Sequence, residues 1–596
     1  MDQYSSFITK FKKKQTFIIC IYALPILILF VFIKSFSVNV PFGDDWHLIP
    51  VFDSIKSGNL SFKLFFSQHN EHRIFFPRII FAILAFASKW NIEAEVWFSF
   101  AISIVSFILI YRISRISFDK HLYLLVVANA LSSLIFFSPI QVENWLWGFQ
   151  ISWFLIINCM ISAVYFLSST NLKYKIFISA SLCLIASFSC AHGLLTWIAL
   201  TPLILSTCRH SWKNKLFTLI SWYFGFLISV VIYTIGYQKP SSHPDTLFFL
   251  KNPVNFLKYF FSLAGSPFNV NQTPIAGILG LLAISLFLYF NYSFIKCLFS
   301  KDRNDVSRLF QSKIAPWLSI GWFAVLFVLM TSVGRVGFGV EQAAASRYTS
   351  MSNLLFISCL QVGLLMYSQK KVNVYLRKKH FFWQGLMKGL VVALFFMQYA
   401  WGISIGSSIG SEYKIQRSHG KQCLELIHYL ETDKFKFACL QTLYPDLGII
   451  KSFYPTLEKI DFRDFPKNVE FANTSFSSPS YGNVDYPKDA LIKLFNHEGL
   501  SIRGWAALPN ENDQPTAVFF SYNEKHSFFA TAPVYQSRPD IEKALGSGKY
   551  SKSGWSGNES INKLPVGDNV IKTWIYSKRA NQFIKLNGEI TVKVMG

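Results

Sequence analysis

Residues 16–36 have the sequence TFIICIYALPILILFVFIKSF, an apolar stretch of the length that a helix needs to cross a bilayer. Lys10 and Lys12 to Lys14 precede it, as basic residues precede the core of a signal peptide. The stretch is too long for such a core, however, and lacks a small-residue cleavage site. We therefore predict a retained first span whose amino-terminal end faces the cytoplasm.

Similar apolar blocks recur along the rest of the chain. Of its 596 residues, 52% are hydrophobic and only 15% are charged, and the mean hydropathy is +0.33. A soluble protein uses about a quarter of its residues for charge. The composition therefore predicts a multi-span α-helical membrane protein and excludes a water-soluble globule.

The net charge of +24 is carried by short basic clusters between the apolar blocks. Membrane orientation explains such clusters better than nucleic-acid binding, because Lys and Arg are enriched in cytoplasmic loops. Between successive clusters there is room for an outgoing and a returning helix, which predicts about eleven spans. The opposite, outer turns then fall at residues 37–93, 139–148, 190–193, 238–273 and 332–348.

Two segments depart from this simple alternation. Ile74 to Trp90 is apolar but short, and a crossing there would place every later basic cluster outside. We predict that it is an amphipathic helix on the outer interface. The two helices predicted within residues 176–206 are also short, so we expect the turn around His192 to lie at membrane depth, lining a cavity.

The chain divides into three regions by composition. Residues 1–406 form the predicted transmembrane domain, with 37–93 as its first outer loop, and residues 407–489 form a mixed linker region with a helix expected at Gln422 to Glu431. Residues 490–596 predict a β-sandwich, which span parity places outside, in the periplasm of a bacterium. Its expected strands are Ser501 to Ala507, Thr516 to Ser521, Val570 to Ser577, Phe583 to Leu586 and Glu589 to Val594.

The nine cysteines form no CxxC pair and no Cys/His ligand spacing, so we expect neither a zinc nor a haem site. Cys423 and Cys439 are the only cysteines in the predicted exported part. They form either a disulfide or two separate thiols, because the sequence alone does not place their Cα atoms within bridging distance.

Unusual polar residues are concentrated in the predicted outer turns, whereas the cytoplasmic loops carry mainly orienting basic residues. Ionisable groups at a membrane are costly unless they are paired or functional, so this distribution predicts a site at the outer leaflet. We take as candidates Asp44, Asp45, His69, Glu71, His72, Arg73, Glu143, Trp147, Gln150, His192, Arg335, Arg347 and Tyr348.

The acidic pair Asp44 and Asp45 lies just after the first span, next to Trp46. A neighbouring like charge and partial desolvation increase the proton affinity of a carboxylate, which suits a general base. The alternative is that the pair caps the helix that follows.

Residues 69–73, His-Asn-Glu-His-Arg, are predicted to open the amphipathic helix. A helix amino terminus favours an anion, and Arg73 offers a fork that matches phosphate. A cation held by His69, Glu71 and His72, and a basic helix end on anionic headgroups, remain alternatives.

Arg335 and Arg347 fall in the last outer turn, in a glycine-rich context. The two arginines are suited to clamp a phosphate or a sugar, and a salt bridge to Glu341 is the alternative. Glu143, Trp147 and Gln150 combine an aromatic face with groups that bond to sugars, although Trp147 also fits an interfacial aromatic belt.

With these residues the chain resembles the GT-C class of membrane glycosyltransferases, which use polyprenyl-phosphate-linked sugars, and within it the bacterial enzymes that modify O-antigen of lipopolysaccharide or other surface glycans. The resemblance implies that Asp44 or Asp45 is the base that activates the acceptor. It also implies that Arg73, Arg335, Arg347 and either His69 or His72 surround the leaving phosphate, in an inverting transfer at the periplasmic face of the inner membrane.

The expected partners are the lipid-linked donor, a glycan or lipid-linked acceptor and membrane lipids, without nucleic acid. We expect no cofactor, although a divalent cation remains open, and the oligomeric state is undefined. No glycine-rich nucleotide fingerprint accompanies a strand and helix. The rival functions are a transporter or flippase of lipid-linked glycans, and a polymerase or ligase of the same substrates.

Overall fold

The structure is a computed structural model, in which the chain forms two compact units. It describes residues 20–119, 121–169, 174–207, 212–241, 243–245, 247–268, 273–298, 305–370, 381–472, 481–488, 491–495, 497–509 and 511–595. The first unit comprises residues 1–37, 60–84 and 93–410, and the second comprises residues 38–59, 85–92 and 411–596. Two pieces of the first outer loop therefore cluster with the carboxyl-terminal region and not with the helices that flank them.

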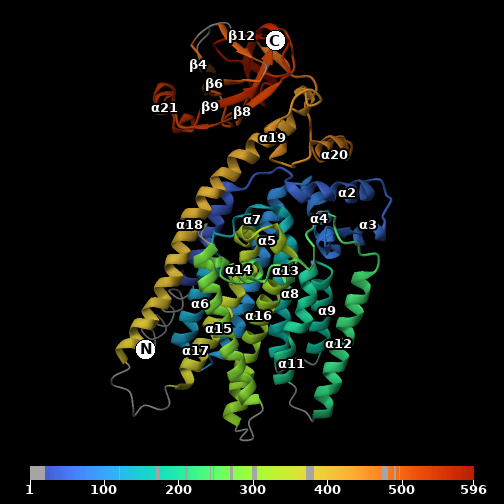
Figure 1. The fold of residues 1–596 in the computed structure, drawn as a ribbon, viewed down its shortest axis with the longest axis vertical. Helices are drawn as coiled ribbons and strands as arrows, with labels where there is room; N and C mark the ends of the chain where they lie inside the picture. Colours follow the sequence, from blue (N-terminus) through green and yellow to red (C-terminus); the bar gives the residue numbers. More distant parts are fainter. Residues whose placement is uncertain are drawn as a thin grey trace, which may run out of the picture. The chain divides into compact units, whose positions relative to one another are not determined.

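The first unit is a bundle of apolar helices (Figure 1). Within the described residues, seven helices are long and apolar enough to cross a membrane: α5 (Ile92–Ser117), α8 (Ile151–Ser168), α12 (Trp212–Thr234), α15 (Thr273–Leu298), α16 (Asp305–Arg335), α17 (Thr349–Lys370) and α18 (Phe381–Glu425). Shorter apolar helices include Cys20–Phe36, α4 (Phe75–Ser88), α6 (Leu122–Phe136) and α9 (Lys175–Ser187). The multi-span helical fold is confirmed, whereas the predicted count of eleven spans is not.

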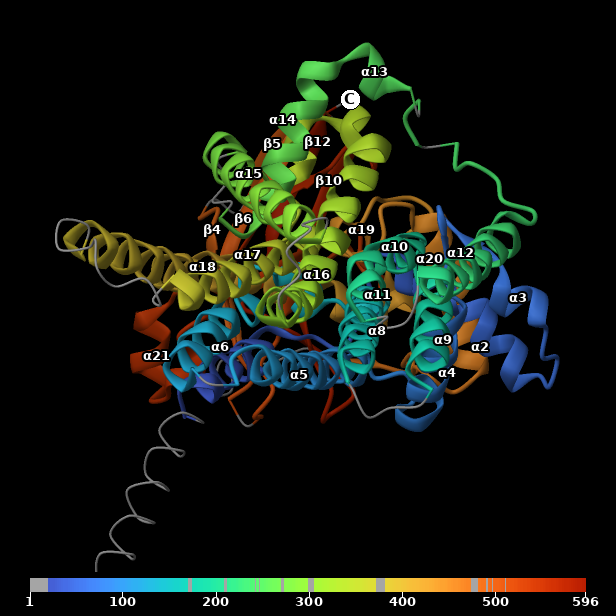
Figure 2. The same ribbon diagram turned by 90° about the horizontal axis from the view of Figure 1, so that it is seen from below.

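Close helix contacts in the bundle depend on small residues. Figure 2 shows the helices nearly end on, with α15, α16 and α17 neighbouring one another. A Cβ atom at Gly280 of α15 would lie 2.0 Å from the carbonyl oxygen of Phe261 in α14 (Pro253–Ala264). A Cβ atom at Gly265 would likewise lie 1.8 Å from the carbonyl oxygen of Ala276. Only glycine permits this backbone approach, as is common where helices pack in a membrane.

The turns between the helices contain short elements that carry the candidate residues. They are α3 (Phe62–Phe66), β1 (Gln68–His69), β2 (His72–Arg73), α7 (Val142–Leu146), η2 (Gly148–Gln150), η3 (Ala191–Leu194), α10 (Leu195–Ala199), α11 (Thr201–Thr207), α13 (Phe248–Lys251), η4 (Ser266–Phe268), η5 (Val336–Phe338), η6 (Val340–Ala344) and η7 (Ser346–Tyr348).

One prediction about these turns is wrong. His69 to Arg73 do not open a helix but form a two-stranded hairpin, with His69 opposite His72, and α4 begins only at Phe75. Asn70 supplies the turn with a φ of 47°, a conformation that asparagine tolerates better than most residues. The helix amino terminus that we expected to attract an anion is therefore not located at these residues.

In the second unit, the part of α18 beyond Gly410 joins η8 (Ile427–Tyr429), α19 (Ala438–Gln441) and α20 (Leu447–Lys459). The helix predicted over Gln422 to Glu431 is wrong in its bounds, since α18 continues without a break to Glu425. The first-loop elements η1 (Gly43–Leu48) and α2 (Ile49–Lys56) belong to this unit. Phe52, Trp90 and Phe462 pack their rings together and fix these segments to one another.

The rest of the second unit is β-rich. Its strands are β3 (Glu470–Ala472), β4 (Gly482–Tyr486), β5 (Leu491–Phe495), β6 (Gly499–Ala506), β7 (Ala517–Tyr522), β8 (Ala530–Gln536), β9 (Gly554–Ser560), β10 (Gly567–Ser577), β11 (Gln582–Lys585) and β12 (Ile590–Met595). The main path of pairing is β3-β11-β10-β7-β8-β9-β6-β4, and β5 joins through β12. The five expected strands correspond to β6, β7, β10, β11 and β12 and are confirmed.

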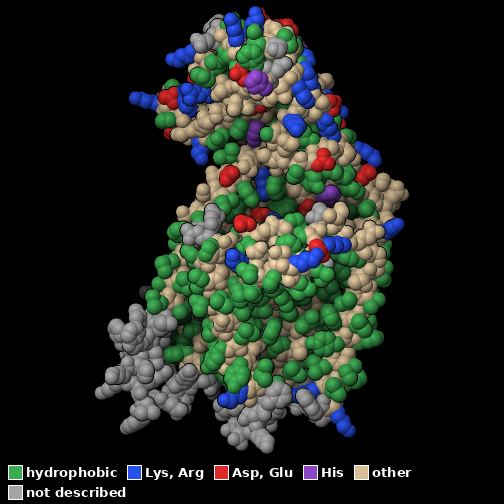
Figure 3. Space-filling view, in the orientation of Figure 1, with side chains coloured by type: hydrophobic (Ala, Val, Ile, Leu, Met, Phe, Trp, Pro, Cys, Tyr) green, Lys and Arg blue, Asp and Glu red, His purple; other side chains and the backbone are tan. Residues whose placement is uncertain are grey.

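Side-chain chemistry differs sharply between the two units. In Figure 3, hydrophobic side chains cover the visible face of the helical bundle, whereas Lys, Arg, Asp and Glu are interspersed over the β-rich region. Large exposed apolar residues such as Leu227, Leu282 and Tyr292 belong to the bundle helices α12 and α15. A bilayer accounts for this exposure, because water would penalise it.

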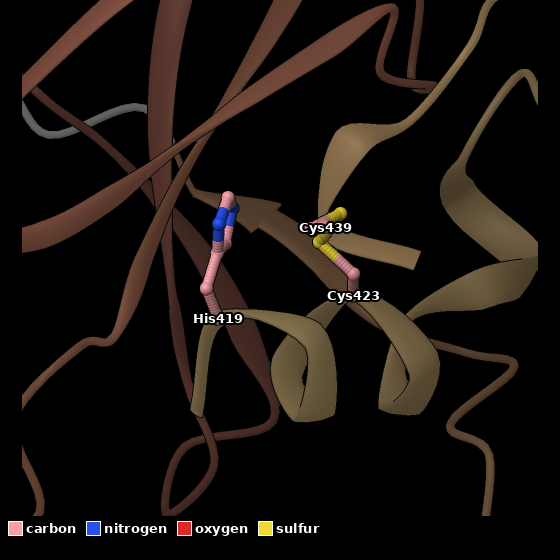
Figure 4. A group of neighbouring side chains, drawn as sticks. All are labelled: His419, Cys423 and Cys439. Atoms are coloured by element: carbon pink, nitrogen blue, oxygen red, sulfur yellow. A yellow bond between two sulfur atoms is a disulfide. The ribbon is translucent and has the colours of Figure 1, made fainter. Parts of the chain in front are cut away.

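Cys423 and Cys439 form a disulfide, with their Cα atoms 6.3 Å apart (Figure 4). The bond links the end of α18 to α19. The buried His419 lies beside it and shares a hydrogen bond of 3.0 Å with the hydroxyl of Thr531. The three side chains have a grouping that suits a metal, but oxidised cysteines do not offer the thiolates that bind one. Of the two alternatives that the sequence left open, the structure contains the disulfide.

Candidate functional site

The central feature of the first unit is an ion pair between Glu71 and Arg335. Glu71 lies in the turn between β1 and β2, and Arg335 is the last residue of α16, 264 positions further along the chain. Their side chains are only 18% and 22% exposed. The sequence alternative that paired Arg335 with Glu341 is not what the structure contains, since the guanidinium donates to the Glu71 carboxylate.

Two histidines complete the surroundings of Glu71. His243 Nε2 lies 3.3 Å from one carboxylate oxygen, and His72 Nε2 lies 3.6 Å from the other. Burial by itself would raise the pKa of Glu71, but His72, Arg335 and His243 together lower it to about 2. Burial also lowers the pKa of His243, which favours its neutral form. We call Glu71, His72, His243 and Arg335 the Glu71 cluster; its carboxylate is ionised at neutral pH.

The turn at residues 190–193 also contacts the Glu71 cluster, through His72. The backbone N–H of Ala191, in η3, donates to His72 Nδ1 at 3.4 Å, and the thiol of Cys190 lies 3.8 Å from the same nitrogen. His192 is buried and shares a hydrogen bond of 3.1 Å with the Thr331 hydroxyl on α16. The turns containing Glu71, His192, His243 and Arg335 therefore lie together, and each belongs to a turn that the sequence predicts to be outer.

The segment after α12 lies against this cluster. The Gln68 amide donates to the carbonyl of Gln238 and its oxygen accepts from the Gln238 N–H at 3.0 Å. A Cβ atom at Gly337 would lie 2.4 Å from Pro244, so this glycine allows the segment to pass close to η5. These contacts place His243 beside Glu71.

A second ion pair joins Glu143 of α7 to Arg347 of η7. Arg347 Nη1 donates to Glu143 Oε1 at 2.9 Å, while Oε2 accepts from the Arg347 N–H and from the Ser346 hydroxyl, each at 3.0 Å. The neighbouring Asn144 donates to the carbonyl of Arg347 at 2.9 Å. The guanidinium also lies over the Tyr348 ring, 5.1 Å from its centroid. Arg347 is therefore held at both its backbone and its guanidinium by α7.

Several aromatic rings contact one another near the two ion pairs. The Trp153 ring lies 5.4 Å from His192 and 6.2 Å from the buried Tyr348, between centroids. His69 packs against Phe149 at 5.0 Å, and Trp147 stacks on the same phenylalanine at 6.0 Å. Gln150 is buried at the start of α8. Of these residues, Trp147 and Gln150 belong to the stretch for which the sequence predicted sugar stacking and hydrogen bonding.

Arg73 has a different environment from the other arginines. It is buried, and its guanidinium donates to the carbonyl oxygens of Phe66, Tyr233 and Ile235. Three backbone acceptors use its donors and connect the hairpin to the end of α12. We therefore interpret Arg73 as a residue that positions the hairpin, and we assign no phosphate contact to it.

The acidic pair lies in the second unit, where the two carboxylates have distinct environments. Asp45 is fully buried, and its Oδ2 accepts from the N–H of Phe42 at 2.9 Å, which caps η1. Asp44 is half-buried, and its charge, after burial, contributes to the raised pKa of the Tyr444 hydroxyl. The alternative in which the pair caps a helix thus describes Asp45, whereas Asp44 remains accessible.

Two participants and one pairing were missed from the sequence. Cys190 and His243 were not singled out, and Glu71 was not expected to pair with Arg335. A signal was present, since both missed residues lie within or beside predicted outer turns. Their pairing depends on contacts between turns, which no local pattern contains.

Comparisons with known proteins give likenesses of fold only. No protein-family model matches the chain, and no curated protein matches it. Among solved structures, the undecaprenyl-phosphate-bound ArnT of Cupriavidus metallidurans aligns at 9% identity and a TM-score of 0.26, over 59% of this chain and 78% of ArnT. The apo ArnT gives 10% and 0.29, over 76% of this chain and 90% of ArnT.

The Archaeoglobus fulgidus oligosaccharyltransferase, solved with zinc and sulfate, aligns at 12% identity and a TM-score of 0.39. The match covers 76% of this chain and 60% of that one. At such scores the likenesses identify no residues, so we derive the function from the residues of this chain.

Proposed function

We propose that this protein is a GT-C class membrane glycosyltransferase that moves a sugar from a polyprenyl-phosphate donor to a surface glycan or lipid-linked acceptor. The observation that carries the proposal is the convergence of Glu71 and His72, from one turn of an apolar bundle, with His243 and Arg335 from two others. Buried charges are costly, so such a cluster at the bundle surface is a strong candidate for a site. The chemistry is assigned to the periplasmic face of a bacterial inner membrane.

In this proposal the arginines serve the leaving group. A polyprenyl phosphate gains negative charge as its bond to the anomeric carbon breaks, and fixed guanidinium groups stabilise that charge most in the transition state. Arg335 and Arg347 are already oriented by Glu71 and Glu143, which reduces the reorganisation needed during reaction. The partly exposed rings of Trp147 and Trp153 are the proposed stacking faces for the sugar.

Asp44 is the proposed general base. It accepts the proton of the acceptor hydroxyl, the hydroxyl oxygen bonds to the anomeric carbon, and the carbon–oxygen bond to phosphate breaks. Direct displacement inverts the configuration at that carbon. Asp45 is better suited to shape η1, because it is buried and its carboxylate already caps the turn.

The test compares Asp44→Asn with Asp45→Asn in the intact protein. We expect Asp44→Asn to remove transfer while the protein level and the affinity for donor stay unchanged. Asp45→Asn should instead lower stability and leave measurable transfer. Wild-type transfer in Asp44→Asn would reject the base assignment.

The readout also separates the rival functions. Mass spectrometry of the surface glycan, with and without the protein, should show a difference of one sugar residue. A change in chain length would indicate a polymerase or ligase, and an unchanged glycan with accumulated cytoplasmic precursor would indicate a transporter.

A further inference from the structure

The second unit has a sheet face of unusual chemistry, formed by strands β4, β6, β9 and the end of β8. On β6, Leu500 and Ile502 point inward and are buried, while Ser501 and Arg503 are exposed on the opposite face. The exposed face continues onto the neighbouring strands. We call it the polar face, and its members are Tyr486, Ser501, Arg503, Gln536, Ser556 and Asn558.

The strand register brings these side chains together. Arg503 lies opposite Tyr486 on one side and opposite Ser556 on the other, and Ser501 pairs with Asn558. The Gln536 amide donates to the Ser556 hydroxyl at 2.6 Å. A row of hydroxyls and amides thus lies beside one exposed aromatic ring, since Tyr486 is 42% exposed.

Arg503 is the exposed charged residue of the polar face. Its guanidinium lies over the Tyr486 ring, 4.9 Å from the centroid. Within the described residues no ion pair involves Arg503, whereas the nearby Arg538 is neutralised by Asp485 and Asp540. A planar guanidinium held against an aromatic ring is well placed to form two parallel hydrogen bonds to a carboxylate.

Next to the polar face, on the same side of the sheet, the apolar residue Trp505 is covered by neighbouring elements. Trp505, two residues beyond Arg503 on β6, packs with Leu545 against Ile541 and Tyr550. These belong to α21 (Pro539–Leu545) and to η9 (Gly548–Tyr550). The uncovered part is therefore the part whose side chains are polar, with a helix as a wall beside it.

We propose that the polar face binds a glycan that carries an acidic sugar, the acceptor or its growing chain. This inference rests on the proposed function and names the substrate class of that enzyme. The C–H side of a pyranose ring stacks on Tyr486, hydroxyls bond to Ser501, Gln536 and Asn558, and a ring carboxylate pairs with Arg503. A membrane surface is disfavoured, because one aromatic ring among hydroxyls is not an apolar patch.

The experiment uses the full chain in lipid nanodiscs. Two probes are titrated, a hexamer of galacturonic acid and neutral maltohexaose, with Arg503→Gln, Tyr486→Ala and the control Lys493→Gln, which removes an exposed charge from β5 on another part of the sheet. We expect wild-type protein to bind the acidic hexamer at least ten times more tightly than the neutral one. Arg503→Gln should abolish that preference, and Tyr486→Ala should weaken both probes about tenfold.

If Lys493→Gln lost as much affinity for the acidic hexamer as Arg503→Gln, the attraction would be non-specific and the inference would be overturned. Failure of the wild-type protein to bind either probe would also overturn it. Binding to empty nanodiscs at the same level would indicate the lipid and also overturn it. Consumption of donor by the same samples is measured separately. Sugar transfer without glycan binding would contradict the binding role of the polar face but not the proposed transferase activity. Glycan binding without sugar transfer would contradict the transferase activity but not the binding role of the polar face.

Discussion

The two partly buried ion pairs of the helical unit, Glu143 with Arg347 and Glu71 with Arg335, differ in how many hydrogen bonds hold them. Glu143 accepts three hydrogen bonds from the adjacent residues Ser346 and Arg347, so the pair is one closed clamp. Glu71 instead divides its oxygens among Arg335, the adjacent His72 and His243, which comes from another segment. We call the ion pair of Glu143 and Arg347 the closed pair, and it suits a fixed binding group. We call the ion pair of Glu71 and Arg335 the shared pair, because its strength also depends on the protonation of His72 and His243.

The largest effect is expected from opening the closed clamp. Glu143→Ala leaves the Arg347 charge buried without its carboxylate, which should cost about 3 to 5 kcal/mol of stability. Thermal unfolding of the purified protein in detergent measures the loss. Glu143→Gln is the matched control, because its amide oxygen still accepts a hydrogen bond. A wild-type melting temperature in Glu143→Ala would show that the clamp does not hold Arg347.

Removing the other arginine tests binding more than stability. Arg335→Ala should weaken donor binding by roughly 2 to 5 kcal/mol, the range for breaking a buried charged contact. The dependence of transfer rate on donor concentration measures this effect. Glu71→Gln should have a smaller effect, since Arg335 stays in the protein. An unchanged donor dependence in Arg335→Ala would remove Arg335 from the proposed phosphate site.

Acid should weaken the ion pair of Glu71. The pKa of Glu71 is lowered in the folded protein to about 2, from an ordinary value of 4.5, so its ionised form stabilises the fold above pH 4.5. This contribution, on the order of 3 kcal/mol, is lost as the pH falls from about 4.5 to about 2. Unfolding curves across this range should be steeper in pH for wild type than for Glu71→Gln. Parallel curves would contradict the shared ion pair.

The smallest effect concerns the hydroxyl of the closed clamp. Ser346→Ala removes the hydrogen bond that the hydroxyl donates to the Glu143 carboxylate and the one that it accepts from the Glu143 N–H, and should cost about 1 to 2 kcal/mol. Ser346→Thr keeps the hydroxyl and serves as the comparison. Urea or thermal unfolding detects the difference, and an effect as large as that of Glu143→Ala would mean that the serine supports more than these two bonds.

The position of the candidate residues could be predicted only in part. Their presence in outer turns followed from the alternation of apolar blocks and basic clusters, and the structure brings several of these turns together. The hairpin at residues 68–73 could not be foreseen, because Asn70 and the bonds of Arg73 to the end of α12 override the helical pattern. The separation of Asp44 from Asp45 was equally hidden, since it depends on which carboxylate faces the Phe42 N–H.

The sequence by itself determined the membrane character and five strands of the β-rich region. Each of these follows from periodicity or hydrophobicity within a single segment, which acts locally. Only the tertiary structure decided that Glu71 pairs with Arg335, that Arg347 is held by Glu143, and that the cysteines are joined. Those contacts connect residues 16 to 264 positions apart, so their energies depend on how the elements pack and not on any local pattern.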